Sequence, residues 1–114
     1  MEVFGPLTLE TRADGVATVT MDVAGEALNT LRDDFNDAFD ALLTRLEAPS
    51  VIRAVVFASG KPDSFIAGAD IRMLSRVNRA DDAADLSRAA QAAFARLEAL
   101  PVPVVAAIHG ACLG

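Results

Sequence analysis

Several features that define other classes of protein are missing from this sequence of 114 residues. It holds one cysteine, Cys112, so neither an intrachain disulfide nor a cysteine cluster for zinc is possible, as suits a reducing compartment. No apolar run approaches the roughly 18 residues that a membrane-spanning helix needs, and the longest, at residues 102–108, contains Pro103. The N-terminus carries neither a signal-peptide nor a transit-peptide pattern. These absences predict a cytoplasmic protein without a membrane span.

Signatures of nucleotide and nucleic-acid binding are also missing. There is no Gly-x-Gly-x-x-Gly fingerprint and no Walker loop, so the chain offers no dinucleotide or triphosphate site. The net charge of -6 and the pI near 4.5 disfavour nucleic acid as a partner. Four of the ten basic residues nevertheless fall close together, where they either meet a small anionic ligand or form a solvated helix face. The four are Lys61, Arg72, Arg76 and Arg79.

The residues that are present are unusually apolar for a small domain. The hydrophobic fraction is 53% and the mean hydropathy is +0.35. The expected elements have a mixed α/β order, strand, strand, helix, strand, helix, helix, strand, and nothing follows to cover one side of the last strand. We therefore expect residues 1–114 to be the N-terminal part of a longer protein. We also expect the isolated piece to be inactive and prone to aggregation.

Hydrophobic periodicity places two strands and a helix in the first half of the chain. Residues 7–12 and 16–22 alternate with the period of half-buried strands, and the turn at Gly15 between them predicts an antiparallel hairpin. Thr30 and Asp33 resemble a capping box, which predicts a helix from about residue 31. Apolar residues then recur every three or four positions, and the helix is expected to end before Pro49.

Two further strands and two helices are expected in the second half. Residues 51–58 and 102–108 are short, mostly apolar and β-branched, as strands buried on both faces are. A short helix is expected over residues 70–76 and a longer one from Asp81, with an apolar stripe whose alanines suggest close packing. The stripe consists of Leu86, Ala90, Ala93, Leu97 and Leu100.

The stretch at residues 59–74 connects a buried strand to the short helix and is the most informative in the sequence. It passes through Ala67, Gly68 and Ala69 to an expected helix start at Asp70. Small residues before a helix leave its first backbone N–H groups unobstructed, and these groups carry partial positive charge. Such a place suits an anion or a developing oxyanion.

Few other residues offer catalytic chemistry. His109 and Gly110 are similar to the oxyanion loop of α/β-hydrolases, but the Gly-x-Ser-x-Gly elbow is missing, which favours a structural role for His109. Cys112 has no identifiable activating base. Asp70 is best explained as a helix cap, and Glu26 in its loop has no assigned role. Neither a carboxylate pair for proton transfer nor a metal-binding set is evident.

Two motifs together carry a resemblance to a known family. Residues 60–71 read Gly-Lys-Pro-Asp-Ser-Phe-Ile-Ala-Gly-Ala-Asp-Ile, and residues 108–114 read Ile-His-Gly-Ala-Cys-Leu-Gly. Both resemble the crotonase (enoyl-CoA hydratase/isomerase) family, most of all its multifunctional members in fatty-acid β-oxidation, with single-function hydratases as the nearby alternative. The resemblance covers nearly the whole chain, including residues 27–30. It implies the N-terminal portion of a crotonase-type ββα spiral fold, in which residues 1–114 are one truncated part of an enoyl-CoA hydratase/isomerase domain.

The resemblance also implies a site. The substrate is expected to be a coenzyme A thioester whose carbonyl oxygen is held by two backbone N–H groups. One donor is implied at Ala69, while the second donor and two catalytic glutamates are implied beyond Gly114. Arg72 is placed near the nucleotide end of coenzyme A. The implied substrate-contacting segment consists of Gly68, Ala69, Asp70, Ile71 and Arg72.

The implied reaction of the full-length protein is syn hydration of a 2-trans-enoyl-CoA to a 3-hydroxyacyl-CoA. No cofactor or metal is implied in this segment; coenzyme A arrives with the substrate, and NAD belongs to a downstream dehydrogenase domain in multifunctional members. The family also implies an oligomer, with a thiolase subunit as a partner of those members. Open alternatives are isomerase or hydrolase chemistry on acyl-CoA, a non-catalytic acyl-CoA-binding relative, and an α/β-hydrolase. Acyl chain length is not predicted.

Overall fold

The first strands form an antiparallel unit in the computed structural model, which describes residues 1–114. Strand β1 (Glu2–Phe4) pairs with β2 (Leu7–Thr11), and β2 pairs with β3 (Val16–Met21). The turn between β2 and β3 contains Gly15 at φ +89°, a conformation that glycine adopts at little cost. The predicted hairpin is confirmed. Strand β1 was not predicted, because three residues are too short for a periodic signal.

Two parallel strands complete a five-stranded sheet in the order β1-β2-β3-β4-β5. Strand β4 (Ala54–Ser59) lies beside β3, and β5 (Val104–Ala106) lies beside β4. Both are shorter than predicted. Val55 in β4 is fully buried, but Val105 in β5 is 57% exposed. The prediction of a fully buried last strand is therefore wrong for this chain, because β5 is an edge strand with a neighbour on one side only.

Helix α1 (Phe35–Glu47) begins later than predicted. Its N-cap is Asp34, which makes no side-chain capping hydrogen bond, so the capping box at Thr30 does not form. The reason lies in Leu31, whose backbone N–H and C=O pair with another loop and are not available to a helix. The predicted apolar stripe is otherwise confirmed. Its buried members are Phe35, Phe39, Leu42, Leu43 and Leu46.

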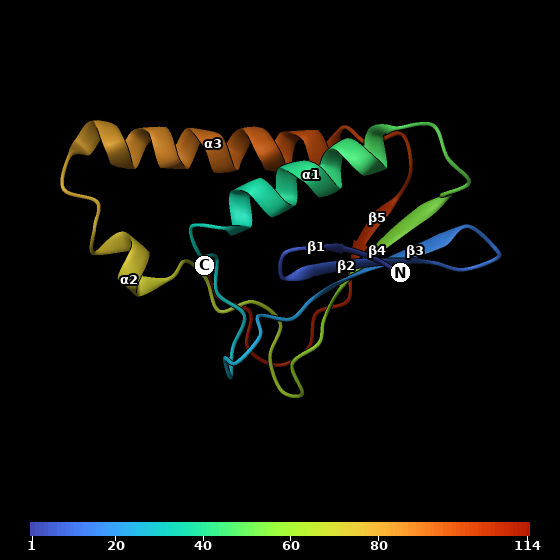
Figure 1. Cartoon of the computed structure of the whole chain (residues 1–114), viewed down its shortest axis with the longest axis horizontal. Helices are drawn as coiled ribbons and strands as arrows, with labels where there is room; N and C mark the ends of the chain where they lie inside the picture. Colours follow the sequence, from blue (N-terminus) through green and yellow to red (C-terminus); the bar gives the residue numbers. More distant parts are fainter.

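Helices α2 (Ile71–Leu74) and α3 (Ala80–Glu98) follow β4. Figure 1 shows α1 and α3 on the same side of the sheet, with α3 running alongside α1. Arg96 of α3 joins the two helices by ion pairs with Asp40 and Glu47. No residue of α3 is fully buried, so the close packing suggested by its alanines holds only along the side that faces α1 and the core.

The hydrophobic core lies between the sheet and α1. Thirteen buried residues form one cluster, and they come mainly from β2, β3 and α1. Residues of α3 and β5 reach the cluster only as partly buried neighbours, among them Leu97 and Val104. The core therefore stabilises mainly the hairpin and α1. The loops that follow β3, β4 and β5 are held by other interactions, which are described below.

Candidate functional site

Three loops gather at one end of the sheet, where β3, β4 and β5 finish (Figure 1). They comprise residues 22–31, 60–70 and 107–114, and we refer to them as the loop cluster. Parallel strands present their carboxyl ends at the same edge, which is where ligands bind in many α/β folds. The two motifs identified in the sequence both lie in this cluster.

The first pair of loops is joined by backbone hydrogen bonds that leave one donor free. Leu31 donates its N–H to the carbonyl of Gly68 at 2.9 Å, and Asp70 donates to the carbonyl of Leu31 at 3.0 Å. These bonds use the groups on either side of Ala69, as parallel pairing requires. The N–H of Ala69 has no hydrogen-bond partner in the chain. The exposed residue Ala69 thus holds a backbone donor that is available to a ligand.

The second pair of loops brings the glycine turns together. Phe65 donates its N–H to the carbonyl of Ala111 at 2.8 Å, and Leu113 donates to the carbonyl of Ile66 at 2.9 Å. Gly68 has φ +105°, and a Cβ placed on it would lie 3.4 Å from the Cα of Gly114. The two motifs of the sequence are therefore in contact at this point, as the resemblance implies.

A buried asparagine holds the loop cluster together from below. Asn29 is 1% exposed. Its Oδ1 accepts the N–H of Val23, and the two protons of its Nδ2 are shared among three acceptors, the carbonyls of Met21 and Phe65 and the hydroxyl of Ser59. One side chain thus bonds backbone groups at the end of β3 and in the loop after β4, together with the hydroxyl of Ser59 at the end of β4, which stabilises a single arrangement of the loops.

Lys61 is buried as well, at 9% exposure. Its ammonium donates to the carbonyls of Val23 and Glu26, each at 2.7 Å, and lies 2.6 Å from a carboxylate oxygen of Asp22. All three protons of the ammonium group thus have an acceptor. Lys61 is neither a solvated helix residue nor a free cation for an anionic ligand, which corrects both predictions for it. Its role is to fix the loop after β3.

The other cations of the predicted cluster also have acidic neighbours. Arg76 pairs with Asp33, and Arg79 lies 4.0 Å from Asp81. Arg72 lies 3.4 Å from Asp70 and 3.5 Å from Glu26, and these carboxylates, Asp70 first, raise the pKa of Arg72 above its ordinary value. Arg72 is therefore a permanent cation, 70% exposed, within a mixed-charge surface. Because each of these arginines has a carboxylate beside it, the surface attracts a free anion only weakly.

Asp70 occupies the N-cap of α2, as predicted, but its carboxylate makes no capping hydrogen bond and pairs with Arg72. The helix is one turn long, so its dipole adds little at Ala69. The expected oxyanion site at a helix start is corrected accordingly: the available donor is a loop N–H left free by parallel pairing. Ile71, the next residue, is 80% exposed.

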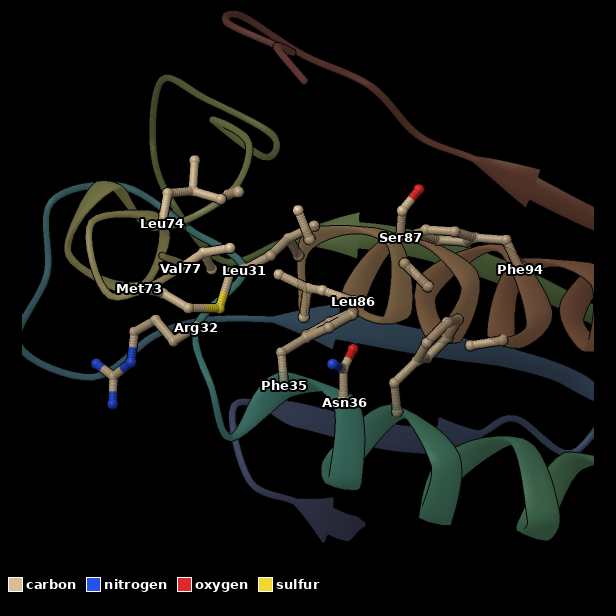
Figure 2. Close-up of a pocket in the computed structure, with 15 residues that line it drawn as sticks. Leu31, Arg32, Phe35, Asn36, Met73, Leu74, Val77, Leu86, Ser87 and Phe94 are labelled. Carbon is tan, nitrogen blue, oxygen red and sulfur yellow. The ribbon is translucent and has the colours of Figure 1, made fainter. Parts of the chain in front are cut away.

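Two apolar cavities meet at Ala69. The glycine cavity, of about 480 Å³, is lined by Gly68, Ala69, Gly114 and apolar residues of β4, β5 and α3. The helix cavity, of about 270 Å³, lies between α1, α2 and α3. Figure 2 shows Met73 and Leu86 pointing into the helix cavity, with the guanidinium of Arg32 directed away from it. Both cavities are lined by Leu31, Phe35, Phe39, Ala69 and Phe94.

The structure brings only some of the predicted site residues together in one cavity. Gly68 and Ala69 line the glycine cavity, while Asp70 and Arg72 lie on the neighbouring charged surface. Cys112 is exposed and lines the same cavity. No three His, Cys, Asp or Glu side chains gather as metal ligands would. None of the helices has the length and apolar character needed to traverse a bilayer.

Two residues that organise the site were missed by sequence reasoning. Asn29 was part of the resemblance but received no role, and Lys61 was assigned to solvent or to an anion. The spacing of Asn29 from an apolar strand end is a weak signal for a buried hydrogen-bonding residue. Nothing in a single sequence marks a lysine as buried, because its acceptors are backbone carbonyls of another loop.

Comparisons with known proteins agree with this geometry. The family model described as enoyl-CoA hydratase/isomerase matches residues 11–114. The chain belongs to the enoyl-CoA hydratase/isomerase family. It is 56% identical over 107 residues to the fatty acid oxidation complex subunit alpha of Idiomarina loihiensis, a match that covers 94% of this chain and 15% of that protein. The recognition of the crotonase family is confirmed, and so is its predicted similarity to members of fatty-acid β-oxidation.

Solved structures of the family share the fold. An enoyl-CoA hydratase/isomerase from Xanthobacter autotrophicus Py2 matches with a TM-score of 0.82 and 25% identity, over 96% of this chain and 40% of that one. An enoyl-CoA hydratase from Mycobacterium smegmatis matches in fold with a TM-score of 0.80 and 24% identity, over 90% of this chain and 39% of that one. The predicted partial crotonase-type α/β fold is therefore confirmed, and the chain spans about two fifths of these solved structures.

Proposed function

We propose that residues 1–114 are the N-terminal part of an enoyl-CoA hydratase/isomerase domain, and that the full-length protein hydrates 2-trans-enoyl-CoA in fatty-acid β-oxidation. The observation that carries this proposal is the free N–H of Ala69, a residue that lines an apolar cavity together with Gly114 and follows Gly68, which contacts Gly114. Family membership and the similarity to a fatty acid oxidation complex subunit support the choice of substrate.

The proposed role of Ala69 is to polarise the thioester carbonyl. Negative charge grows on that oxygen as water adds to the double bond, so a fixed N–H donor stabilises the transition state more than the ground state. By resemblance, the second donor is the glycine after Gly114, and the two glutamates that deliver water also lie further along. Losing one such donor typically costs about 10²- to 10³-fold in kcat.

The neighbouring surfaces supply the rest of the proposed substrate site. The apolar glycine cavity suits an acyl group, because most of its lining is hydrophobic. Ile71 and Arg72, which follow close after Ala69, are exposed, and we place the coenzyme A part on their side of the site. We place Arg72 near the nucleotide end of coenzyme A, with Asp70 and Glu26 orienting its guanidinium.

Partners and cofactors remain part of the proposal. Coenzyme A is part of the substrate, and no resident cofactor is proposed for this segment. NAD would serve a downstream 3-hydroxyacyl-CoA dehydrogenase domain, and a thiolase subunit would be a partner in an oligomeric complex. A cytoplasmic location fits this assignment.

The test is an assay of the full-length protein with crotonyl-CoA, in which hydration removes the absorbance of the conjugated thioester. We expect turnover that depends on enzyme concentration. A 3-enoyl-CoA that gains conjugation in the assay, without loss of crotonyl-CoA, would assign isomerase chemistry instead. Release of free coenzyme A would assign a hydrolase, and binding without turnover would assign a non-catalytic relative.

A further inference from the structure

We propose that His109 and Lys61 are positioning residues that hold the segment ending at Gly114 in register with Ala69. The inference rests on the proposed function, because it assigns a task to two residues outside the donor itself. It is carried by a gap in the pairing of the loops after β4 and β5, and by the side chains that bridge this gap.

The backbone ladder between these two loops is interrupted. The last bond of the sheet runs from the N–H of Ala107 to the carbonyl of Phe57 at 2.7 Å. Pairing resumes only where Phe65 donates to Ala111 at 2.8 Å. Ser64 is the bridge partner of Ala111, so residues 58–63 lie opposite residues 108–110, and the longer segment must bulge out of the ladder. Backbone pairing cannot fix the relative position of the two loops across this interval.

His109 crosses the interval with its side chain. Its Nε2 lies 2.9 Å from the carbonyl oxygen of Lys61. A carbonyl can only accept, so Nε2 carries the proton and donates it. The next residue, Gly110, has φ +62°, and a Cβ placed there would lie 1.9 Å from the carbonyl oxygen of Asp63. The turn at Gly110 therefore packs directly against Asp63, close to Lys61, whose carbonyl binds the imidazole.

Lys61 fixes the other end of this link. Its ammonium is held by Asp22, Val23 and Glu26, so its backbone is tied to the loop after β3. The carbonyl that His109 reaches therefore belongs to a residue that is bonded both at its ammonium and at its N–H, which donates to the hydroxyl of Ser59 at 3.0 Å. The loops after β3 and β5 are therefore both bonded to the same residue, Lys61.

The consequence for catalysis concerns alignment. Without the His109 bond, the segment beyond Ala107 is held to the loop after β4 by the bonds at Phe65 and Ile66 alone. A misplacement of about 1 Å at reacting groups can cost 10²-fold in rate. Since two bonds remain, we expect a smaller loss of about tenfold in kcat.

The test compares two amide substitutions in the full-length protein. In His109→Gln the amide nitrogen stands where Nε2 was and can donate to Lys61, whereas in His109→Asn it is too short to reach. Crotonyl-CoA gives kcat and KM, and bound cinnamoyl-CoA reports carbonyl polarisation as a shift of its absorbance to longer wavelength. Arg88→Gln, on the exposed face of α3, is the control and should leave every value unchanged.

We expect His109→Asn to lower kcat about tenfold with KM within twofold of wild type, and to reduce the cinnamoyl-CoA shift. His109→Gln should restore most of both. Wild-type values for His109→Asn, or equal losses in both variants, would overturn the proposal. Wild-type protein that polarises cinnamoyl-CoA without hydrating crotonyl-CoA would disprove the proposed reaction while the shift still decides the role of His109. Absence of both signals would overturn both.

Discussion

The hairpin core and the loop cluster are stabilised by different interactions. In the hairpin core, made of β1 to β3 and α1, apolar side chains such as Val19 and Leu42 are fully buried. In the loop cluster the buried groups that matter are polar, Asn29 and Lys61, and their partners are mostly backbone atoms. The hairpin core is stabilised by the burial and packing of apolar side chains, whereas the loop cluster is stabilised by directional hydrogen bonds.

This difference suits the task proposed for each region. Apolar packing tolerates small adjustments, because volume-conserving changes in a core cost little. A catalytic donor must be placed within a fraction of an ångström, and hydrogen-bonded loops on a rigid sheet achieve this better than packing alone. Variants in the hairpin core should therefore lower stability without changing the polarisation of a bound ligand, whereas variants in the loop cluster that disturb the donor should also change this polarisation.

The largest effect is expected from Gly110→Ala in the loop cluster. Its Cβ would overlap the carbonyl oxygen of Asp63, in addition to the cost of φ +62°, so the free energy of unfolding should fall by about 3 kcal/mol or more. Gly25→Ala is the matched control, because it has φ +76° with no atom within 4 Å and should cost only about 1 kcal/mol. Urea unfolding of the full-length protein measures both, and equal losses would show that the contact with Asp63 is unimportant.

Leu42→Ala tests the hairpin core. Leu42 is 0% exposed, so truncation should lower the free energy of unfolding by about 2–5 kcal/mol through lost burial and a cavity. The shift of bound cinnamoyl-CoA should remain that of wild type in the molecules that stay folded. Leu42→Met, which conserves volume, should cost less than about 1.5 kcal/mol. A reduced shift in Leu42→Ala would show that the core and the donor are not separable.

Asn29→Ala is expected to lower both the stability and the cinnamoyl-CoA shift. It leaves the N–H of Val23 and the carbonyl of Phe65 without a partner, while the carbonyl of Met21 keeps the N–H of Gly60, at a cost of about 2 kcal/mol. Because these groups set the path of the loop that pairs with Ala69, the cinnamoyl-CoA shift should also fall. Ser59→Ala removes one acceptor of Asn29 and the acceptor of the Lys61 N–H but leaves the bonds from Asn29 to the backbone, so it should show a smaller loss in both measurements. An unchanged shift in Asn29→Ala would contradict a positioning role for the asparagine.

The smallest effect should come from the exposed ion pair between Glu47 and Arg96. The hydrogen bond from Arg96 lowers the pKa of Glu47 below its ordinary value of 4.5. The pair therefore stabilises the fold above about this pH, and its contribution is lost as pH falls through the lowered pKa of the folded state. Unfolding midpoints of wild type and Glu47→Gln should differ slightly at neutral pH and converge in acid. Glu98→Gln, which removes a carboxylate without an ion pair in the structure, should show no such convergence.

The contrast between the two regions also explains how far sequence reasoning succeeds. The hairpin and the stripe of α1 follow from periodicity, since Leu7, Val19 and Leu42 occupy positions that any strand or helix of that period would bury. The start of α1 was predicted too early, because the pairing of Leu31 with Gly68 is a contact across 37 positions of the chain that no local pattern records.

The candidate site shows the same division. Ala69 could be named from its motif, and the contact of its neighbour Gly68 with Gly114 followed from the resemblance. The reason that its N–H is free could not be foreseen, because it depends on which atoms of residues 68 and 70 pair with Leu31. The tasks of Lys61 and His109 were equally hidden, since their partners are backbone carbonyls brought close only by the fold.

The most direct measurement replaces the backbone N–H of Ala69, on which the proposed function depends. Exchanging Ala69 for lactic acid in the full-length protein turns its N–H into an ester oxygen and leaves the methyl side chain in place. This N–H makes no hydrogen bond within the chain, so the only bond affected is the one that the carbonyl of Gly68 accepts from Leu31. An ester carbonyl accepts more weakly than an amide carbonyl, and the unfolding midpoint should therefore fall only slightly. We expect kcat for crotonyl-CoA hydration to fall by about 10²- to 10³-fold, with the cinnamoyl-CoA shift reduced. Hydration at the wild-type rate would contradict the assignment of Ala69 as the thioester donor.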